Sequence, residues 1–370
     1  MPQVDMPLSQ LRDYMGSSPR PKDFDDYWTR AIRELDTLEA NHGFDPVWTD
    51  SGFQVGFARC VDLHFTGVGG ARIHARCVFP LDTREDGHPA LLKFHGYSQH
   101  AGDWSALLPY AAEGYFVLAL DVRGQGGDSN DPGTMSAQGT MSAQGTFGAQ
   151  GPFSAAGTTS ARGTSGVPGG SDSRQQMRSG PTLRGHIIRG IESGADALFY
   201  RSVFLDTVAL ARIAAGIPEV DAGRLGAFGG SQGGALALAC AALEPRIRHC
   251  VPVYPFLSDY LRVWELENGN TAYEEIRHYL KRRDPRHEHA ETLFTTLGYI
   301  DVQHLAPWVR ASVLMFTGLM DEVCPPSTQF AVYNRLTCEK HMLLYPDFGH
   351  EPLPDERDIT LNYFRERFGA

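Results

Sequence analysis

Short, fully apolar runs alternate along this chain with longer segments in which apolar residues recur at helical spacing. The apolar runs predict strands at 90–94, 115–120, 224–228, 312–316 and 341–345. The helical spacing predicts helices at 21–40, 105–112, 199–215, 233–243 and 355–368. Strands that are apolar throughout and alternate with helices are typical of a mostly parallel central sheet with helices on both faces. The pattern therefore predicts an α/β fold whose functional residues lie on loops at the carboxyl ends of the strands.

Two segments depart from this alternation. Residues 61–80 alternate apolar with polar side chains and are interrupted by the glycine-rich stretch 67–70, which predicts an antiparallel hairpin. Residues 257–297 are polar and helical, so they do not continue the sheet. We interpret them as a helical excursion between strands that lies near the active site as a lid or rim.

A third segment, residues 133–182, differs from the rest of the chain in composition. It holds 11 of the 40 glycines, and Val167 is its one branched aliphatic residue. The hexapeptide Thr-Met-Ser-Ala-Gln-Gly at 134–139 repeats at 140–145 and returns imperfectly at 146–151. Such a segment cannot bury enough apolar surface to order itself, so a flexible loop is expected. We predict a single domain spanning residues 1–370 that this insert interrupts.

Composition and charge exclude several classes of function. The chain of 370 residues carries a formal charge of −11 and has no cluster of Lys or Arg, so no nucleic-acid partner is expected. No stretch approaches the roughly 18 consecutive apolar residues of a membrane span, and no signal peptide is recognisable, which predicts a cytoplasmic location without a membrane partner. The six cysteines form no CxxC pair, and His-Glu-His at 287–289 lies in a charged run; we predict no metal site.

A candidate nucleophile stands in Gly229-Gly230-Ser231-Gln232-Gly233, which matches the Gly-x-Ser-x-Gly nucleophile elbow. The motif lies between a predicted strand and a predicted Ala-rich helix, as an elbow requires. A tight turn at the serine brings the residues two before and two after it close together, so both must be very small. The turn also exposes the hydroxyl at the start of a helix, where N–H groups favour negative charge. We predict Ser231 as the nucleophile.

A serine nucleophile needs a base, and the elbow predicts the chain order serine, acid, histidine. His350 lies between the predicted strand 341–345 and the last helix, so we predict it as the general base. Asp321 follows the strand at 312–316 and would orient His350, with Asp347 as the competing candidate.

The oxyanion hole of such a site needs two N–H donors. One is expected from Gln232, the residue after the nucleophile. The other is expected from the loop after strand 90–94, where Tyr97 is the first candidate and Gly96 the second.

Three motifs together resemble the signatures of carbohydrate esterase family 7, the acetyl xylan esterases and cephalosporin C deacetylases of the α/β-hydrolase fold. These motifs are Ser231 with its flanking glycines, Arg123-Gly124-Gln125 and His350-Glu351. Further stretches resemble family sequence at 21–28, 65–68, 185–190, 254–260 and 324–330. The likeness covers essentially the whole chain apart from the insert.

The resemblance implies an enzyme that deacetylates acetylated xylo-oligosaccharides, cephalosporin C and small acetate esters without a cofactor. It implies Ser231, Asp321 and His350 as the catalytic triad, with Tyr97 and Gln232 as the oxyanion donors. Members of the family form ring-like hexamers, so the resemblance also implies a homo-oligomer.

The other signature residues, Arg123, Gln125 and Glu351, are interpreted as structural residues near the site. For Arg123 the reason is that a buried guanidinium can tie several loops together. The insert replaces a short link in the family pattern and would narrow substrate access if it projects inward. Two other functions stay open: a carboxylesterase of broader acyl specificity, and a catalytically silent scaffold with the hydrolase fold.

Overall fold

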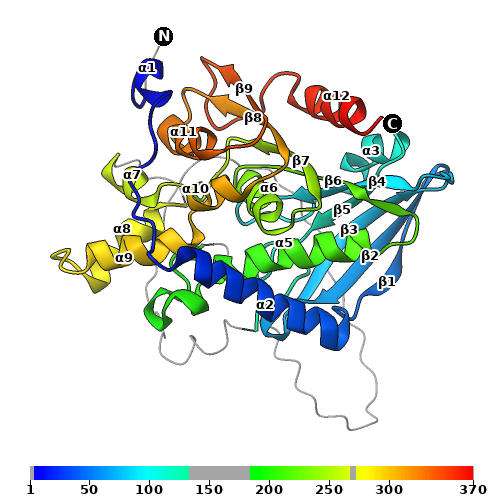
Figure 1. Ribbon diagram of the computed structural model, residues 1–370, viewed down its shortest axis with the longest axis horizontal. Helices are drawn as coiled ribbons and strands as arrows, with labels where there is room; N and C mark the ends of the chain where they lie inside the picture. Colours follow the sequence, from blue (N-terminus) through cyan, green and yellow to red (C-terminus); the bar gives the residue numbers. More distant parts are fainter. Residues whose placement is uncertain (1–3, 133–183, 267–271, 370) are drawn as a thin grey trace, which may run out of the picture.

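A mixed nine-stranded sheet runs through the part of the protein that the computed structural model describes, residues 4–132, 184–266 and 272–369. Its strand order is β1-β2-β3-β5-β4-β6-β7-β8-β9 (Figure 1). The strands are β1 (Val47–Gln54), β2 (Ala58–Thr66), β3 (Arg72–Pro80), β4 (His88–Phe94), β5 (Phe116–Leu120), β6 (Val220–Gly230), β7 (Ile247–Val253), β8 (Ser312–Gly318) and β9 (Lys340–Tyr345). The insert predicted at 133–182 lies outside the described residues.

The sheet has an antiparallel part and a larger parallel part. Strands β1, β2, β3 and β5 pair antiparallel in that order. Strands β5, β4, β6, β7, β8 and β9 pair parallel in that order, which confirms the predicted mostly parallel sheet. The predicted hairpin is also confirmed: β2 and β3 are joined through Gly69 and Gly70, whose φ angles of 67° and 75° favour glycine.

Helices cover both faces of the sheet, as predicted. The helices are α1 (Leu8–Leu11), α2 (Phe24–His42), α3 (Leu108–Ala112), α5 (Phe199–Ala215), α6 (Gln232–Leu243), α7 (Tyr260–Glu265), α8 (Glu274–Arg283), α9 (Ala290–Leu297), α10 (Val302–Leu305), α11 (Pro326–Arg335) and α12 (Glu356–Phe368). One core packs α2, α5, α6 and α10 against the sheet around residues such as Trp28 and Phe204. The second core packs α3 and α12 on the other face around Tyr110 and Phe364 (Figure 1).

Several elements differ from the sequence prediction. Strands β1 and β7 and helix α11 were not predicted, and the helix expected at 105–112 is a 3₁₀ turn, Trp104–Ala106, followed by α3. Strand β1 is an exposed edge strand, so its side chains lack the apolar alternation of a half-buried strand. The predicted excursion at 257–297 contains α7, α8 and α9.

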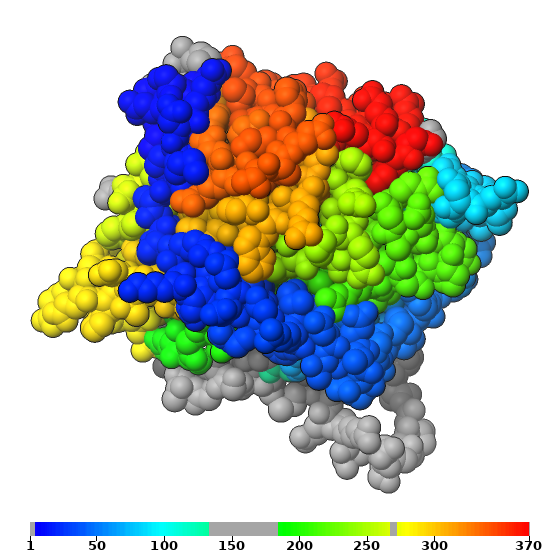
Figure 2. Space-filling model, in the orientation of Figure 1, coloured from blue at the N-terminus to red at the C-terminus, as the bar shows by residue number. Residues whose placement is uncertain are grey.

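The amino-terminal segment lies along the carboxyl-terminal half of the chain (Figure 2). Asn334 of α11 donates hydrogen bonds of 2.9 and 2.8 Å to the carbonyl oxygens of Leu11 and Tyr14. The Tyr14 hydroxyl in turn donates to Asp259, just before α7, at 2.7 Å. These contacts fasten the first residues over the helices that flank strands β8 and β9. No described helix has the length and hydropathy to cross a membrane.

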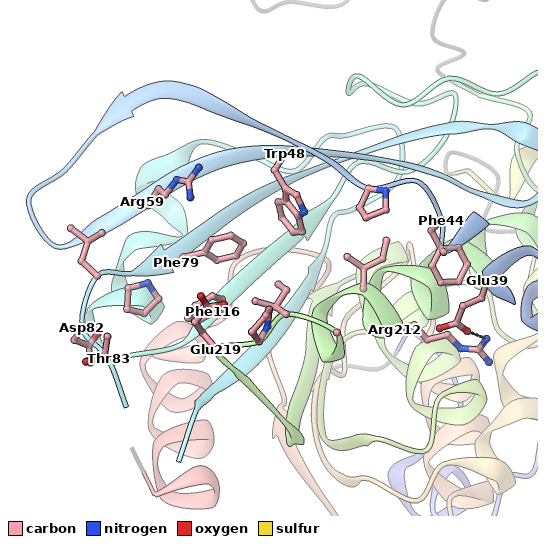
Figure 3. Close-up of a pocket in the computed structure, with 18 residues that line it drawn as sticks. Glu39, Phe44, Trp48, Arg59, Phe79, Asp82, Thr83, Phe116, Arg212 and Glu219 are labelled. Carbon is pink, nitrogen blue, oxygen red and sulfur yellow. Dashed lines mark hydrogen bonds and ion pairs between the residues drawn. The ribbon is translucent and has the colours of Figure 1, made fainter. Parts of the chain in front are cut away.

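A cavity of about 680 Å³ opens at the antiparallel edge of the sheet (Figure 3). Its walls include Trp48 of β1 and Phe79 of β3, together with the Glu39–Arg212 ion pair of 2.6 Å. Phe116 also lines it, at the start of β5. The cavity therefore lies where parallel strands begin, away from the loops at their carboxyl ends.

Candidate active site

Ser231 occupies a strained turn between β6 and α6. Its backbone angles are φ 58° and ψ −120°, which place a non-glycine residue in the left-handed half of conformational space. A Cβ added to Gly229 would lie 2.4 Å from the carbonyl oxygen of Phe94, and one added to Gly233 would lie 2.0 Å from the same atom. Both positions therefore need glycine, as the elbow motif predicts. The Ser231 N–H donates to Val253 at 2.9 Å, which holds the turn against β7.

The structure brings the three residues of the predicted triad together. His350 Nε2 lies 3.0 Å from the Ser231 hydroxyl oxygen, and His350 Nδ1 lies 2.9 Å from a carboxylate oxygen of Asp321. The three side chains follow β6, β8 and β9, whose carboxyl ends lie at the same edge of the parallel sheet, with β7 between β6 and β8. The competing candidate Asp347 is exposed, and the carboxylate bonded to His350 is that of Asp321.

Asp321 is held rigidly beneath the histidine. It is fully buried, and its Oδ1 accepts hydrogen bonds from the backbone N–H groups of Val323 at 2.8 Å and Cys324 at 2.7 Å. The other oxygen, Oδ2, faces His350. The ring of Tyr254 packs against the imidazole with a centroid distance of 4.5 Å. The carboxylate and the aromatic ring together limit the orientations open to His350.

Gln125 joins the loop that carries one predicted oxyanion donor, Tyr97, to the start of the helix that carries the other, Gln232. Gln232 is the first residue of α6, so its N–H has no partner within that helix. Tyr97 lies in the loop after β4, and its neighbour Ser98 donates its N–H to Gln125 Oε1 at 2.9 Å. Gln125 Nε2 donates to Gln232 Oε1 at 2.8 Å, and Tyr200 donates to the same oxygen at 2.8 Å. Gln125 thus holds the loop that carries Tyr97 against the first residue of α6, Gln232.

The other two signature residues also make structural contacts. Arg123 is buried and binds Asp206 of α5 through two hydrogen bonds, of 2.7 and 2.6 Å, and donates to the carbonyl oxygen of Val68 at 3.1 Å. This guanidinium joins the loop after β5 to α5 and to the β2–β3 hairpin. Glu351 is exposed and accepts a hydrogen bond from the Gly349 N–H at 3.1 Å, which shapes the turn that presents His350.

Sequence reasoning did not anticipate the roles of Cys324 and Glu275. A ligand atom each of Cys324, Asp321 and His350 lies within 4.8 Å of the others, a set that could contact a metal ion. Burial raises the pKa of Cys324 well above its ordinary value, so the thiol stays neutral beside the triad. Glu275 of α8 accepts a hydrogen bond from the hydroxyl of Tyr97, which brings the helical excursion to the candidate oxyanion loop. Cys324 begins the stretch 324–330 that resembles family sequence, whereas Glu275 lies in the predicted excursion at 257–297 without a motif of its own.

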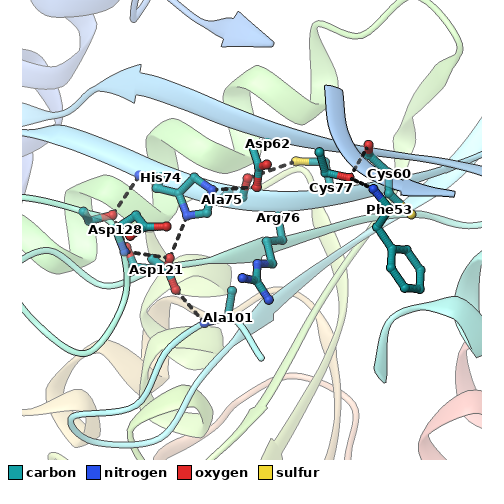
Figure 4. A network of polar contacts seen from close by, with 12 residues as sticks. Phe53, Cys60, Asp62, His74, Ala75, Arg76, Cys77, Ala101, Asp121 and Asp128 are labelled. Carbon is teal, nitrogen blue, oxygen red and sulfur yellow. Dashed lines mark hydrogen bonds and ion pairs between the residues drawn. The ribbon is translucent and has the colours of Figure 1, made fainter. Parts of the chain in front are cut away.

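A second histidine–carboxylate cluster lies in the sheet (Figure 4). His74 of β3 has Nδ1 2.6 Å from Asp121 and Nε2 2.9 Å from Asp62. Asp121 follows β5 and also accepts hydrogen bonds from the N–H groups of Ala101 at 2.5 Å and Asp128 at 3.0 Å. The cluster therefore anchors the start of the loop that continues into Arg123 and Gln125.

The fold and the arrangement of Ser231, His350 and Asp321 are those of an α/β-hydrolase. The chain belongs to the acetyl xylan esterase family, which it matches over residues 1–152 and 137–367. The family and the fold expected from the sequence motifs are therefore confirmed, and the family is one of carboxylic ester hydrolases.

Solved structures and a curated protein show the same relationship. The chain is 46% identical to acetyl xylan esterase 1 from Thermoanaerobacterium sp. JW/SL YS485, with a TM-score of 0.82 and coverage of 98% of this chain and 99% of the other. An acetyl xylan esterase from Paenibacillus sp. R4 is 32% identical, with a TM-score of 0.79 and the same coverage. Acetyl esterase Axe7A of Xylanibacter ruminicola is 30% identical over 171 residues, 45% of this chain. The match spans 36% of the length of that esterase.

Proposed function

We propose that this protein is a serine esterase that removes acetyl groups from acetylated xylo-oligosaccharides, from small acetate esters and from cephalosporin C. The observation that carries this proposal is the chain of contacts from Ser231 through His350 to Asp321, with distances of 3.0 and 2.9 Å. Membership of the acetyl xylan esterase family supports acetyl as the acyl group. The formal charge of −11 is compatible with a neutral sugar ester as substrate.

The geometry supports a two-step acyl transfer. The Ser231 oxygen attacks the acetyl carbonyl while His350 takes the hydroxyl proton, and the N–H groups of Tyr97 and Gln232 bind the resulting oxyanion. The tetrahedral intermediate collapses, the C–O bond to the sugar breaks, and His350 gives its proton to the leaving alcohol. Water, deprotonated by His350, then attacks the acetyl-serine, and acetate leaves as Ser231 regains its proton. Asp321 stabilises the imidazolium in both steps. The chemistry calls for no cofactor.

An activity panel with two variants tests this function. The wild-type protein should release acetate from acetylated xylo-oligosaccharides and turn over p-nitrophenyl acetate at least about tenfold faster than the octanoate ester. Ser231→Ala should abolish both activities in folded protein. Equal rates for the two esters would favour a carboxylesterase of broader specificity. Failure of folded wild-type protein to react with a fluorophosphonate probe would favour a silent scaffold.

We also propose a homo-oligomer, by resemblance a hexamer, and a cytoplasmic location. Large apolar side chains are exposed on and beside the edge strand β1, among them Trp48, Phe53 and Phe57, at 37%, 39% and 44% of their surface. Apolar surface gathered at one edge supports association between copies of the chain. Sedimentation velocity on the full chain tests this proposal, and a monomer at micromolar concentration would contradict it.

A further inference from the structure

Glu275 is a buried carboxylate that serves several donors from other parts of the chain. It lies in α8 and is 7% exposed. It accepts hydrogen bonds from the hydroxyl of Tyr97 and from the backbone N–H groups of Gly185 and Ile187, the latter two at 2.6 and 2.9 Å. Burial raises the pKa of Glu275, although these hydrogen bonds oppose the shift. The Ile188 N–H is a further hydrogen-bond donor to Glu275, and all of these donors are electrically neutral.

The Tyr97 side chain is held along its whole length. Its hydroxyl donates to Glu275 and accepts a hydrogen bond from the His186 N–H at 3.3 Å. Its ring meets the rings of His186 and Phe256 edge to face, with centroid distances of 5.2 and 5.7 Å. The Phe256 N–H donates to the carbonyl oxygen of Ser231 at 3.0 Å. Phe256 therefore contacts both the Tyr97 ring and the backbone of the candidate nucleophile.

A backbone N–H donor does not itself require a particular side chain. The side chain matters when it decides where the N–H points, because an oxyanion donor is effective only about 2.7–3.1 Å from the position of the oxyanion. Tyr97 has loop backbone on both sides. Gln125 holds the N–H of the adjacent Ser98, and Glu275 holds the far end of the Tyr97 side chain through its hydroxyl. The position of α8 therefore affects the geometry of the proposed oxyanion hole.

We propose that Glu275 is a positioning residue for the esterase reaction, which holds the Tyr97 side chain so that the Tyr97 N–H faces the developing oxyanion. The inference rests on the proposed function and deepens it. It assigns to the helical excursion a part in building the oxyanion hole. It also explains why a carboxylate is buried among neutral donors at this place.

Glu275→Gln tests the proposal with a minimal change of shape. One oxygen becomes an NH₂ group, which meets either the Tyr97 hydroxyl or the backbone N–H groups as a second donor. We expect kcat for p-nitrophenyl acetate to fall about 10- to 100-fold, with KM changed less than about twofold, because the oxyanion forms only after substrate has bound. The matched control is Glu274→Gln on the same helix, where Glu274 pairs with His278 and Arg184 near the surface. It should keep wild-type kcat and KM.

Tyr97→Phe removes the hydroxyl alone and closes a double-mutant cycle. If Glu275 acts through Tyr97, the double variant should be no slower than the slower single variant, whereas independent effects would multiply. The proposal would be overturned if folded Glu275→Gln kept wild-type kcat or changed only in KM. It would also be overturned if the effects of the two single substitutions on kcat multiplied in the double variant. Should Glu275→Gln fail to fold, wild-type kcat in Tyr97→Phe would overturn it instead. A wild-type protein that cannot hydrolyse p-nitrophenyl acetate would count against the proposed function, not against this step.

Discussion

Two histidines in this protein each bind a carboxylate through Nδ1, and they differ in what the other ring nitrogen meets. His350 contacts Asp321 at 2.9 Å and presents Nε2 to the Ser231 hydroxyl at 3.0 Å. His74 contacts Asp121 at 2.6 Å and presents Nε2 to a second carboxylate (Figure 4). His350 is 21% exposed at its side chain, whereas His74 is 2% exposed.

The difference separates the proposed general base, His350, from a histidine that two carboxylates enclose. Burial alone would lower the pKa of His74, but the hydrogen bonds and charges of Asp121 and Asp62 outweigh it and raise the pKa. An imidazolium between two carboxylates has no free nitrogen with which to accept a proton. His350 faces a hydroxyl, whose proton it can take. A histidine–aspartate pair therefore identifies a base only when the second nitrogen meets a nucleophile or substrate.

Exchanging each histidine for asparagine tests this comparison most strongly. His350→Asn removes the proposed base, so kcat for p-nitrophenyl acetate should fall about 10⁴-fold or more. His74→Asn should lower kcat less than about tenfold, because His74 lies outside the reacting groups. Steady-state kinetics on both folded variants measures the contrast. Similar losses of kcat in the two variants would show that the two histidines do not differ in their importance for catalysis.

Asp321→Asn tests the role of the carboxylate that contacts His350 Nδ1. The amide cannot stabilise the imidazolium and favours the wrong tautomer of the ring, so kcat should fall about 10³- to 10⁴-fold. Asp347→Asn is the matched control, since Asp347 is the exposed carboxylate in the same loop as His350. It should leave kcat unchanged in the same assay. A large loss in Asp347→Asn with none in Asp321→Asn would reverse the assignment of the acid.

The structural role predicted for His74 should appear in stability. His74→Asn leaves Asp121 buried without its cation, and removal of one partner from a buried ion pair costs about 3 kcal/mol. Urea unfolding at neutral pH measures this loss in the free energy of unfolding. His341→Asn, at an exposed position in β9, is the control and should change stability by less than about 0.5 kcal/mol. Equal stability of the two variants would mean that the buried carboxylate of Asp121 does not need the imidazolium.

Burial decided how much of the fold could be predicted from sequence. Strands β4, β5 and β8 are buried along nearly their whole length, so their apolar runs were recognisable. Strand β1 is exposed along most of its length and has no such run. Strand β7 is interrupted by Arg248 and Pro252. Helix α11 begins with Pro326 and buries polar side chains on its inner face, so its sequence lacks the apolar spacing that predicts a helix.

The site divides in the same way. Ser231, Asp321 and His350 follow strands, and chain order with sheet topology was enough to predict their meeting. Glu275 meets Tyr97 across 178 positions through the packing of α8, for which no local pattern exists. His74 was not distinguished from other strand residues, because Asp121 lies 47 positions away and the alternation of the predicted hairpin does not mark Asp62 as its other partner.

The smallest expected effect is the pH dependence of the contribution that His74 makes to the free energy of unfolding. Since the pKa of His74 is raised on folding, its stabilisation is fully present below its ordinary value of 6.5 and is lost as pH rises through the folded value. The stability difference between wild type and His74→Asn should therefore shrink as pH rises from 6 to 9. The pKa of Asp121 is lowered to about 2, because hydrogen bonds from His74, Asp128 and Ala101 outweigh its burial, so Asp121 stays ionised over that range. Urea unfolding of wild type, His74→Asn and His341→Asn at each pH separates this effect from general titration. A difference that grows with pH would show that the folded protein holds His74 neutral, and His74 would then not be the cation that its two carboxylates imply.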